Sequence, residues 1–148
     1  MQATAFTHKA VAAQLGEVLK EVMTSTRRDF FTLLDEAGLS FTQVKCLSLL
    51  NDADSVSVSE IAEELVLSLA AASRAVDALV QRGEVTRAED ANDRRSRLVS
   101  ITPQGRRSFE RLVAVRRAGV ERLLADLEPG ELESLAAALA PIAERLDR

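Results

Sequence analysis

Residues 87–102, with the sequence RAEDANDRRSRLVSIT, bring four arginines and three acidic side chains together before a run that alternates like a β-strand. A guanidinium group donates paired hydrogen bonds to phosphate, and an arginine at a hairpin tip suits the negative potential of a narrow DNA minor groove. The arginines expected to make such contacts are Arg94 and Arg95. The side chains expected to brace the loop through paired hydrogen bonds are Asp90, Asp93 and Arg97. The alternative for the same cluster is a solvated surface crossed by salt bridges.

The overall charge does not favour a nucleic-acid partner, because the chain of 148 residues carries a formal net charge of −4 at pH 7. The charge is unevenly distributed, however. Residues 94–117 contain eight arginines and one glutamate, whereas residues 126–147 contain six acidic residues and one arginine. This segregation predicts a basic surface on an acidic protein. The basic segment can therefore bind an anionic partner despite the negative net charge.

The composition predicts one globular domain in the cytoplasm. The length suffices for a single core, and 47% hydrophobic with 28% charged residues is ordinary for a soluble protein. No apolar run approaches the roughly 18 residues that span a bilayer, so no membrane association is expected. Cys46 is the single cysteine, which precludes an intramolecular disulfide and agrees with a reducing compartment. With one histidine and no glycine-rich phosphate loop or metal-spaced cluster, the sequence predicts no enzyme, no metal and no cofactor.

Apolar spacing predicts a mainly α-helical fold with a small β-hairpin. Apolar residues at intervals of three and four from Val11 to Leu34 predict one long helix that ends before Gly38. Two serines mark the next helix starts, because Ser40 and Ser57 are each followed three residues later by a side chain that completes a capping box. Helices are therefore predicted over about 41–51 and 58–65.

The second half of the chain continues with a helix over 68–82, a two-stranded hairpin over 84–101 and two further helices. Pro103 begins a long helix whose apolar positions reach Leu127, and Pro129 begins another that runs to the C-terminus. Two short helices joined by a tight turn and followed by a hairpin form a helix-turn-helix pattern with a wing.

The helix over 68–82 separates into two faces. The residues predicted to face the core are Ala72, Ala75, Val76 and Leu79. The small or polar residues left on the outer face are Ser68, Ala70, Ala71, Ser73 and Arg74. Such a face can enter the DNA major groove, where Arg74 can reach a guanine edge or a phosphate. Alternatively, Arg74 can pair with Asp77, three residues further along the helix.

The stretch from Ile61 to Arg107 resembles the multiple-antibiotic-resistance-regulator (MarR) family. The positions that match the family pattern are Ala62, Leu65, Val76, Leu79, Gly83, Val85, Arg87, Asp90, Asp93, Arg94, Arg95, Thr102 and Gly105. The resemblance implies a single domain in which a winged helix-turn-helix core, at about 40–102, lies between N- and C-terminal dimerisation helices at about 1–38 and 103–148.

The resemblance implies a homodimeric transcriptional regulator, usually a repressor, that binds a pseudo-palindromic operator in double-stranded DNA through the helix at 68–82 and the wing at 84–101. It also implies a pocket for a small amphipathic or aromatic effector, with Phe30, Phe31 and Cys46 as the facing candidates. Cys46 has either a structural role or a redox role. Its expected burial favours the structural role.

Two features depart from the family pattern. The start of the predicted reading helix, SLAAAS, is more apolar than usual, so thymine-methyl contact or DNA shape is expected to contribute to specificity. Val66 occupies a turn position where glycine is frequent. The competing function is a winged-helix protein-interaction module that does not bind DNA sequence-specifically.

Overall fold

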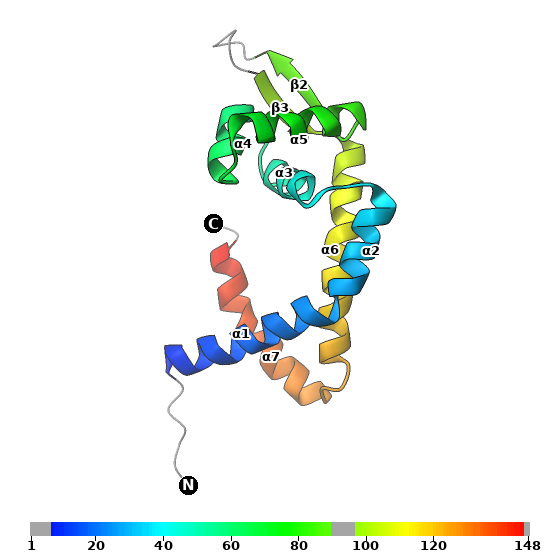
Figure 1. The fold of residues 1–148 in the computed structure, drawn as a ribbon. Coiled ribbons are helices and arrows are strands. Elements are labelled where there is room, and N and C mark those ends of the chain that lie inside the picture. The colour runs from blue at the N-terminus through cyan, green and yellow to red at the C-terminus, as the bar shows by residue number, and fades with distance from the viewer. Residues whose placement is uncertain (1–6, 90–96, 147–148) are drawn as a thin grey trace. The chain divides into compact units, whose positions relative to one another are not determined.

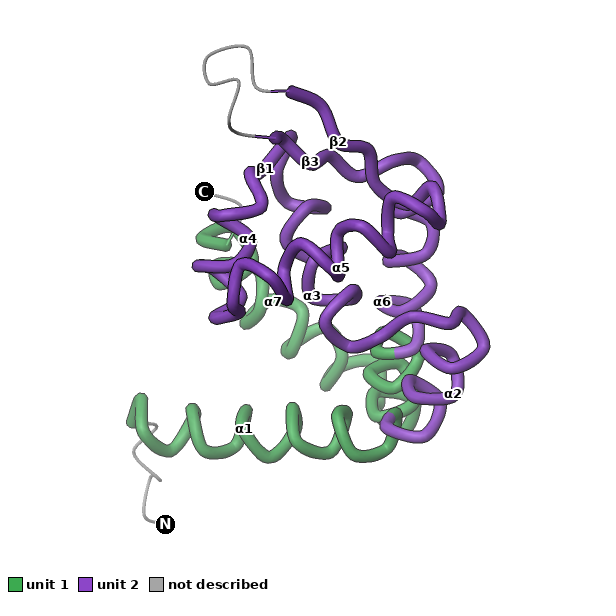
Figure 2. The backbone as a smooth tube through the Cα atoms, turned by 45° about the horizontal axis from the view of Figure 1, so that its top comes forward, with its two compact units in different colours: residues 1–26, 116–148 green, residues 27–115 purple. Residues whose placement is uncertain are grey.

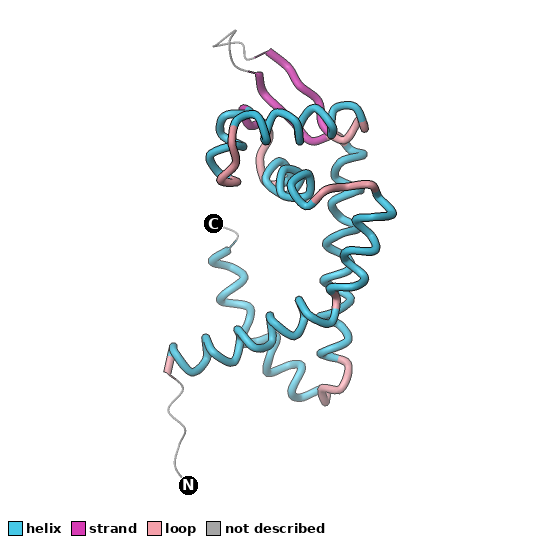
Figure 3. The backbone as a smooth tube through the Cα atoms, viewed as in Figure 1, coloured by secondary structure: helices cyan, strands magenta, loops and turns pink. Residues whose placement is uncertain are grey.

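The helices of the computed structural model, which describes residues 7–89 and 97–146, follow the predicted order (Figure 1). They are α1 His8–Ser25, α2 Arg27–Ala37, α3 Phe41–Asn51, α4 Val58–Glu64, α5 Leu69–Gln81, α6 Pro103–Leu124 and α7 Pro129–Leu146. The strands are β1 Val56–Ser57, β2 Val85–Glu89 and β3 Arg97–Ile101 (Figure 3). Within these described ranges, no helix has the length and apolarity that a membrane crossing requires.

The chain divides into two units (Figure 2). Unit 1 comprises residues 1–26 and 116–148, and unit 2 comprises residues 27–115. The division places α2 and the first part of α6 with the winged helix-turn-helix elements, so both boundaries lie inside the segments that the sequence assigns to dimerisation.

Unit 2 encloses the main hydrophobic core. The side chains with no exposed surface include Leu47 and Leu50 of α3, Ile61 of α4, Val76 and Leu79 of α5, and Val99 of β3. The inward face predicted for α5 is confirmed, since all four of its members are buried. These apolar contacts fix α4 and α5 against α3 and the sheet, which gives the helix-turn-helix a rigid base.

Serine caps define the helix starts in unit 2. The Ser40 hydroxyl accepts a hydrogen bond from the Gln43 N–H at 3.2 Å, and the Ser40 N–H donates to the Gln43 side chain at 2.7 Å. Ser57 and Glu60 repeat this reciprocal pair at 3.2 and 2.8 Å. Hydrogen bonding by the Ser57 side chain and backbone lowers the pKa of Glu60. Both predicted capping boxes are confirmed.

The wing is part of a three-stranded sheet and not of an isolated hairpin. The strand order is β1-β3-β2, with antiparallel pairing throughout, and Val99 of β3 lies between Val56 of β1 and Arg87 of β2. The two-stranded prediction is therefore corrected, because β1 has two residues and is too short to show an alternating pattern.

The predicted long N-terminal helix is interrupted at Thr26, which corrects the single-helix expectation. The Thr26 hydroxyl donates to the Val22 carbonyl at 2.6 Å, and its backbone N–H donates to the same oxygen at 3.1 Å. Arg116 of α6 donates to the Met23 carbonyl at 3.2 Å and to the Thr26 hydroxyl. A Cβ at Gly119 would overlap the Thr26 side chain, so α6 approaches closely at the break. Hydrophobic periodicity contains no information about this distant approach.

The other helix ends are largely as predicted. Gly38 has a φ of +62°, and the N–H of Leu39 donates to the Leu34 carbonyl at 3.0 Å, as expected for a glycine after the last turn. The expectation that one helix reaches Leu127 is wrong, because α6 ends at Leu124. Pro129 disfavours the helical conformation of the residue before it, so α6 cannot continue into α7.

Candidate nucleic-acid interface

The first turn of α5 presents the predicted reading residues in two groups. Ala70 and Arg74 are exposed, whereas Ala71 and Ser73 are less accessible, with Ser73 half-buried. Ser68 is the N-cap, and its hydroxyl oxygen accepts a hydrogen bond from the Ala71 N–H at 3.1 Å. Ser68 therefore has a structural role at the helix start, and the outward groups of the turn are mainly apolar.

Leu69 belongs to the same turn, and the sequence patterns do not single it out. Its side chain is 58% exposed at the first position of α5. Helical spacing assigns leucine to the core by default, and only the helix position shows that this one lies outside the buried stripe. The position of Leu69 directly after a capping serine is the sequence feature that indicates its exposure. This first turn is the part of a recognition helix that contacts base edges.

The turn between α4 and α5 holds Val66 in a left-handed conformation with a φ of +54°. The N–H of Val66 donates to the Glu63 carbonyl at 3.1 Å, and the N–H of Leu67 donates to the Ala62 carbonyl at 2.8 Å. These bonds form the helix-end motif in which glycine is usual. A β-branched residue is strained there, and the side chain gains no burial because it is 91% exposed.

The wing tip lies outside the described residues. The predicted contact residues Arg94 and Arg95, and the predicted bracing residues Asp90 and Asp93, all fall in that segment, so their roles stay predictions. Arg97 is described as the exposed first residue of β3.

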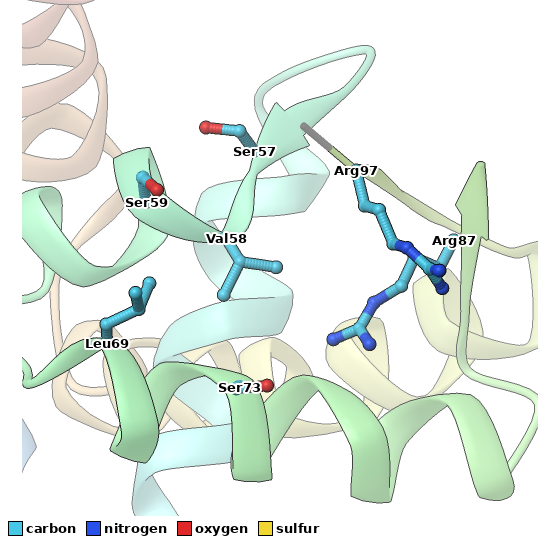
Figure 4. A pocket seen from close by; sticks show the side chains of 7 residues that line it. All are labelled: Ser57, Val58, Ser59, Leu69, Ser73, Arg87 and Arg97. Atoms are coloured by element: carbon cyan, nitrogen blue, oxygen red, sulfur yellow. The ribbon is translucent and has the colours of Figure 1, made fainter. Parts of the chain in front are cut away.

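A hollow of about 280 Å³ lies between α5 and the base of the wing. Its lining residues are Ser57, Val58, Ser59, Leu69, Ser73, Arg87 and Arg97. Figure 4 shows Arg87 and Arg97 coming from β2 and β3 on one side of the hollow, opposite Val58 and Leu69. The hollow thus combines two guanidinium groups with serine hydroxyls, which is the chemistry that holds an oxyanion.

Arg87 carries the most informative contacts in this hollow. Its Nη1 pairs with the Asp77 carboxylate at 2.8 Å, and the side chain is 20% exposed. Its Nε and Nη2 are buried without a hydrogen-bond partner in the part of the chain that the structure describes. Buried donors of this kind are costly to leave unpaired, so these two N–H groups are an unfavourable feature of the hollow.

The pairing of Asp77 also bears on Arg74. Because Asp77 pairs with Arg87 of β2, its carboxylate links α5 to the wing. Among the described side chains, no ion pair joins Asp77 to Arg74. The alternative prediction of an Arg74–Asp77 pair is therefore wrong. Arg74 borders a second hollow together with Ser40, Thr42, Gln43, Ala71 and Ala75.

A junction behind the interface fixes the far end of α5. Arg82 donates to the Ala37 carbonyl at 2.6 Å and pairs with Glu84 at 3.2 Å. Glu84 is 2% exposed and also accepts from the Ser108 hydroxyl at 2.9 Å. These contacts tie the end of α5 and the start of β2 to α2 and α6.

The residues expected to line an effector pocket lie in different environments. Phe30 and Cys46 are buried in the core of unit 2, whereas Phe31 is 56% exposed and contacts Phe30 edge to face at 5.8 Å between ring centroids. Neither hollow described above is lined by any of the three. Burial raises the pKa of the Cys46 thiol to about 11. No group of three potential metal ligands occurs among the described residues.

Comparison with known proteins agrees with this geometry. The MarR family pattern matches residues 39–96. The HTH-type transcriptional regulator YfiV of Bacillus subtilis is 30% identical over 146 residues, covering 88% of this chain and 91% of the relative. The HTH-type transcriptional repressor MdtR of the same organism is 28% identical and covers 85% and 81%.

A solved structure shows the same fold. A mutant of MepR from S. aureus, bound to an oligodeoxyribonucleotide, has a TM-score of 0.65 and 19% identity, and the match covers 95% of this chain and 99% of that one. Together with the capped helix pair, the three-stranded wing sheet and the similarity to YfiV, these matches place the chain in the MarR family of helix-turn-helix transcriptional regulators.

Proposed function

We propose that this regulator is a cytoplasmic, homodimeric repressor that binds a pseudo-palindromic operator through α5 and the wing. The observation that carries the proposal is the hollow between these two elements, which Arg87 and Arg97 line together with serine side chains. A backbone phosphate in this hollow accepts hydrogen bonds from the exposed Arg97, and its negative charge offsets the positive charge of Arg87 and Arg97.

The two DNA-facing elements divide the contacts. α5 lies in the major groove with its first turn against the base edges, and Arg74 reaches a guanine or a phosphate. The wing places Arg94 and Arg95 in the adjacent minor groove, where the potential is most negative. MepR in complex with an oligodeoxyribonucleotide supports this docking as a fold-level comparison.

Unit 1 supplies the contact between two copies of the chain. On α1, the exposed apolar side chains are Val11, Leu15, Val18, Leu19 and Met23. On α7, they are Leu132, Leu139, Ile142 and Leu146. Such surfaces are unfavourable in water and are buried when a second copy packs on them. Two joined copies then bind half-sites about one helical turn apart.

The repressor activity is relieved by a small amphipathic or aromatic effector, and the regulator itself performs no catalysis. MdtR, which is named a repressor, supports the direction of regulation. An effector acts here by changing the separation of the two α5 helices, because both must enter successive grooves at the same time.

The test is a fluorescence-anisotropy titration against a duplex selected from a random pool and against a scrambled duplex, at two salt concentrations. We expect affinity for both to fall steeply with salt, since phosphate contacts release counterions, and the selected duplex to bind more tightly at each salt. Affinity that does not depend on salt, or no binding at low salt, contradicts the proposal and favours the protein-interaction module.

Single variants locate the contacts in the same assay. Arg95→Ala and Arg97→Ala are each expected to lower affinity by about tenfold. The matched control is Arg28→Ala on the exposed surface of α2, which removes the same charge and should leave affinity within about twofold. Equal losses in all three variants would mean that only net charge matters.

A further inference from the structure

The first turn of α5 exposes apolar side chains where a reading helix is expected to carry hydrogen-bonding groups. Leu69 is 58% exposed and Ala70 is exposed beside it. The Ser68 oxygen is already the acceptor of the helix cap at 3.1 Å. The groups left for hydrogen bonding at this end of the helix are the O–H of Ser68, Ser73 and Arg74.

Only one group in the DNA major groove matches an exposed leucine and alanine. The base edges there display carbonyl, amino and ring-nitrogen groups, and the C5-methyl of thymine is the single apolar feature. Apolar side chains gain free energy when they remove a methyl group from water. Against an amino or carbonyl edge, they displace water from a polar group and offer it no partner.

The charges around this turn favour a duplex over an apolar protein surface as the occupant. Leu69 lines the same hollow as Arg87 and Arg97, and Arg74 is exposed one turn along α5. The two exposed guanidinium groups, of Arg74 and Arg97, beside a small apolar surface complement phosphates around a base edge. An apolar protein partner would have to bury or displace these charges at a considerable desolvation cost.

We propose that Leu69 and Ala70 form a methyl-reading surface that recognises C5-methyl groups of thymine in each operator half-site. Arg74 supplies the accompanying hydrogen bonds, and the arginines of the hollow hold the backbone in place. This inference rests on the proposed function and adds the chemical feature that the regulator distinguishes. Cytosine presents hydrogen in place of the methyl, so the surface discriminates against it.

The test replaces single thymines by uracil in the duplex selected from a random pool, because this change removes the methyl and preserves base pairing. At one or two positions in each half-site, replacement of thymine by uracil should lower the affinity of the protein for the duplex by about threefold to tenfold. Replacement at the remaining positions should leave the affinity unchanged. We define the thymine-to-uracil ratio at a position as the affinity for the duplex with thymine divided by the affinity for the duplex with uracil. In Leu69→Ala, this ratio should fall close to one at one of these positions.

Two variants of the same helix serve as controls. Arg74→Ala should lower affinity but keep the thymine-to-uracil ratio. Val80→Ala, which shortens a 39% exposed side chain in the last turn of α5, should change neither quantity.

The possible results separate this inference from the proposed function. A pool that yields a preferred duplex in which no thymine is sensitive to uracil overturns the methyl reading and leaves the regulator function in place. A ratio that persists in Leu69→Ala overturns the assignment of Leu69. A pool that yields no preferred duplex overturns the proposed operator recognition itself, and the methyl reading with it.

Discussion

Unit 2 and unit 1 differ in how much of their apolar surface they bury within one chain. In unit 2, a continuous core includes side chains with no exposed surface from α3, α4, α5 and β3. In unit 1, α1 buries only Val22, and no described residue of α7 is buried. Unit 2 therefore has the interior of an independently stable domain, whereas unit 1 leaves exposed the apolar faces that the proposed second copy covers.

The two units carry the same formal net charge of −2 at pH 7, but they differ in where that charge is placed. Unit 2 holds the hollow lined by Arg87 and Arg97, whereas residues 126–147 of unit 1 contain six acidic residues and one arginine. An acidic segment is repelled by DNA and a basic hollow attracts it. This difference supports the proposed DNA contact through unit 2 and the proposed pairing of copies through unit 1.

The largest expected effect is on the stability of unit 2. Leu47→Ala should lower its free energy of unfolding by about 3 kcal/mol, because it leaves a cavity around a completely buried side chain. Leu15→Ala in α1 should cost less than about 1 kcal/mol in the dissociated chain, since Leu15 is 49% exposed there. Urea unfolding at low protein concentration measures both. Equal losses would show that the units do not differ in self-sufficiency.

The next effect is on the pairing of chains. The double variant Leu15→Glu with Leu139→Glu should weaken the homodimer by at least about 100-fold, because two charges enter an apolar interface. Sedimentation equilibrium measures the dissociation constant, and anisotropy on a single half-site measures what remains of DNA binding. We expect the half-site affinity to be retained. A dimer that survives both charges would place the contact elsewhere.

A smaller effect is expected at the strained turn of unit 2. Val66→Gly should raise the free energy of unfolding by about 1 kcal/mol, since glycine adopts a φ of +54° without steric cost. The control Val80→Gly should lower it by a similar amount, because it introduces glycine into a regular helix. Thermal unfolding shows whether each variant is more or less stable than the unmodified chain. If both variants are less stable, Val66 is not strained at its positive φ.

The last effect, which is absent at neutral pH and appears only at high pH, concerns Cys46. Its pKa is raised to about 11 by burial, so the thiol contributes stability that is fully present below its usual pKa of 9.0 and is lost as pH rises towards 11. Cys46→Ala should flatten this part of the stability profile. At pH 7 the native thiol should react with iodoacetamide far more slowly than the unfolded chain. Rapid native-state alkylation would instead indicate an accessible thiolate.

The parts of the fold that could be predicted are those that neighbouring residues determine. Ser40 with Gln43 and Ser57 with Glu60 satisfy each other within one turn, so sequence spacing reveals them. Arg116, 90 residues away in the chain, contacts the helix break at Thr26, and the apolar periodicity of the N-terminal segment does not reveal this contact. Strand β1 needs Val99 as its partner and is too short to leave a pattern of its own.

The same distinction applies to the candidate site. The outward position of Arg74 follows from helix periodicity, and it is exposed as expected. The hollow could not be predicted, because Arg87 and Arg97 meet Leu69 and Ser73 only after the sheet packs beside α5. Leu69 was missed because its residue type suggests the core, and only its position at the helix start exposes it.

The most direct test of the division between the units is hydroxyl-radical footprinting of the full chain on its selected duplex. Two copies joined through unit 1 and reading through unit 2 should protect two symmetric tracts about one helical turn, roughly 10 base pairs, apart. The Leu15→Glu, Leu139→Glu variant should protect one tract at higher concentration. A single tract from the unmodified chain, or two tracts from the variant at unchanged concentration, would contradict the account.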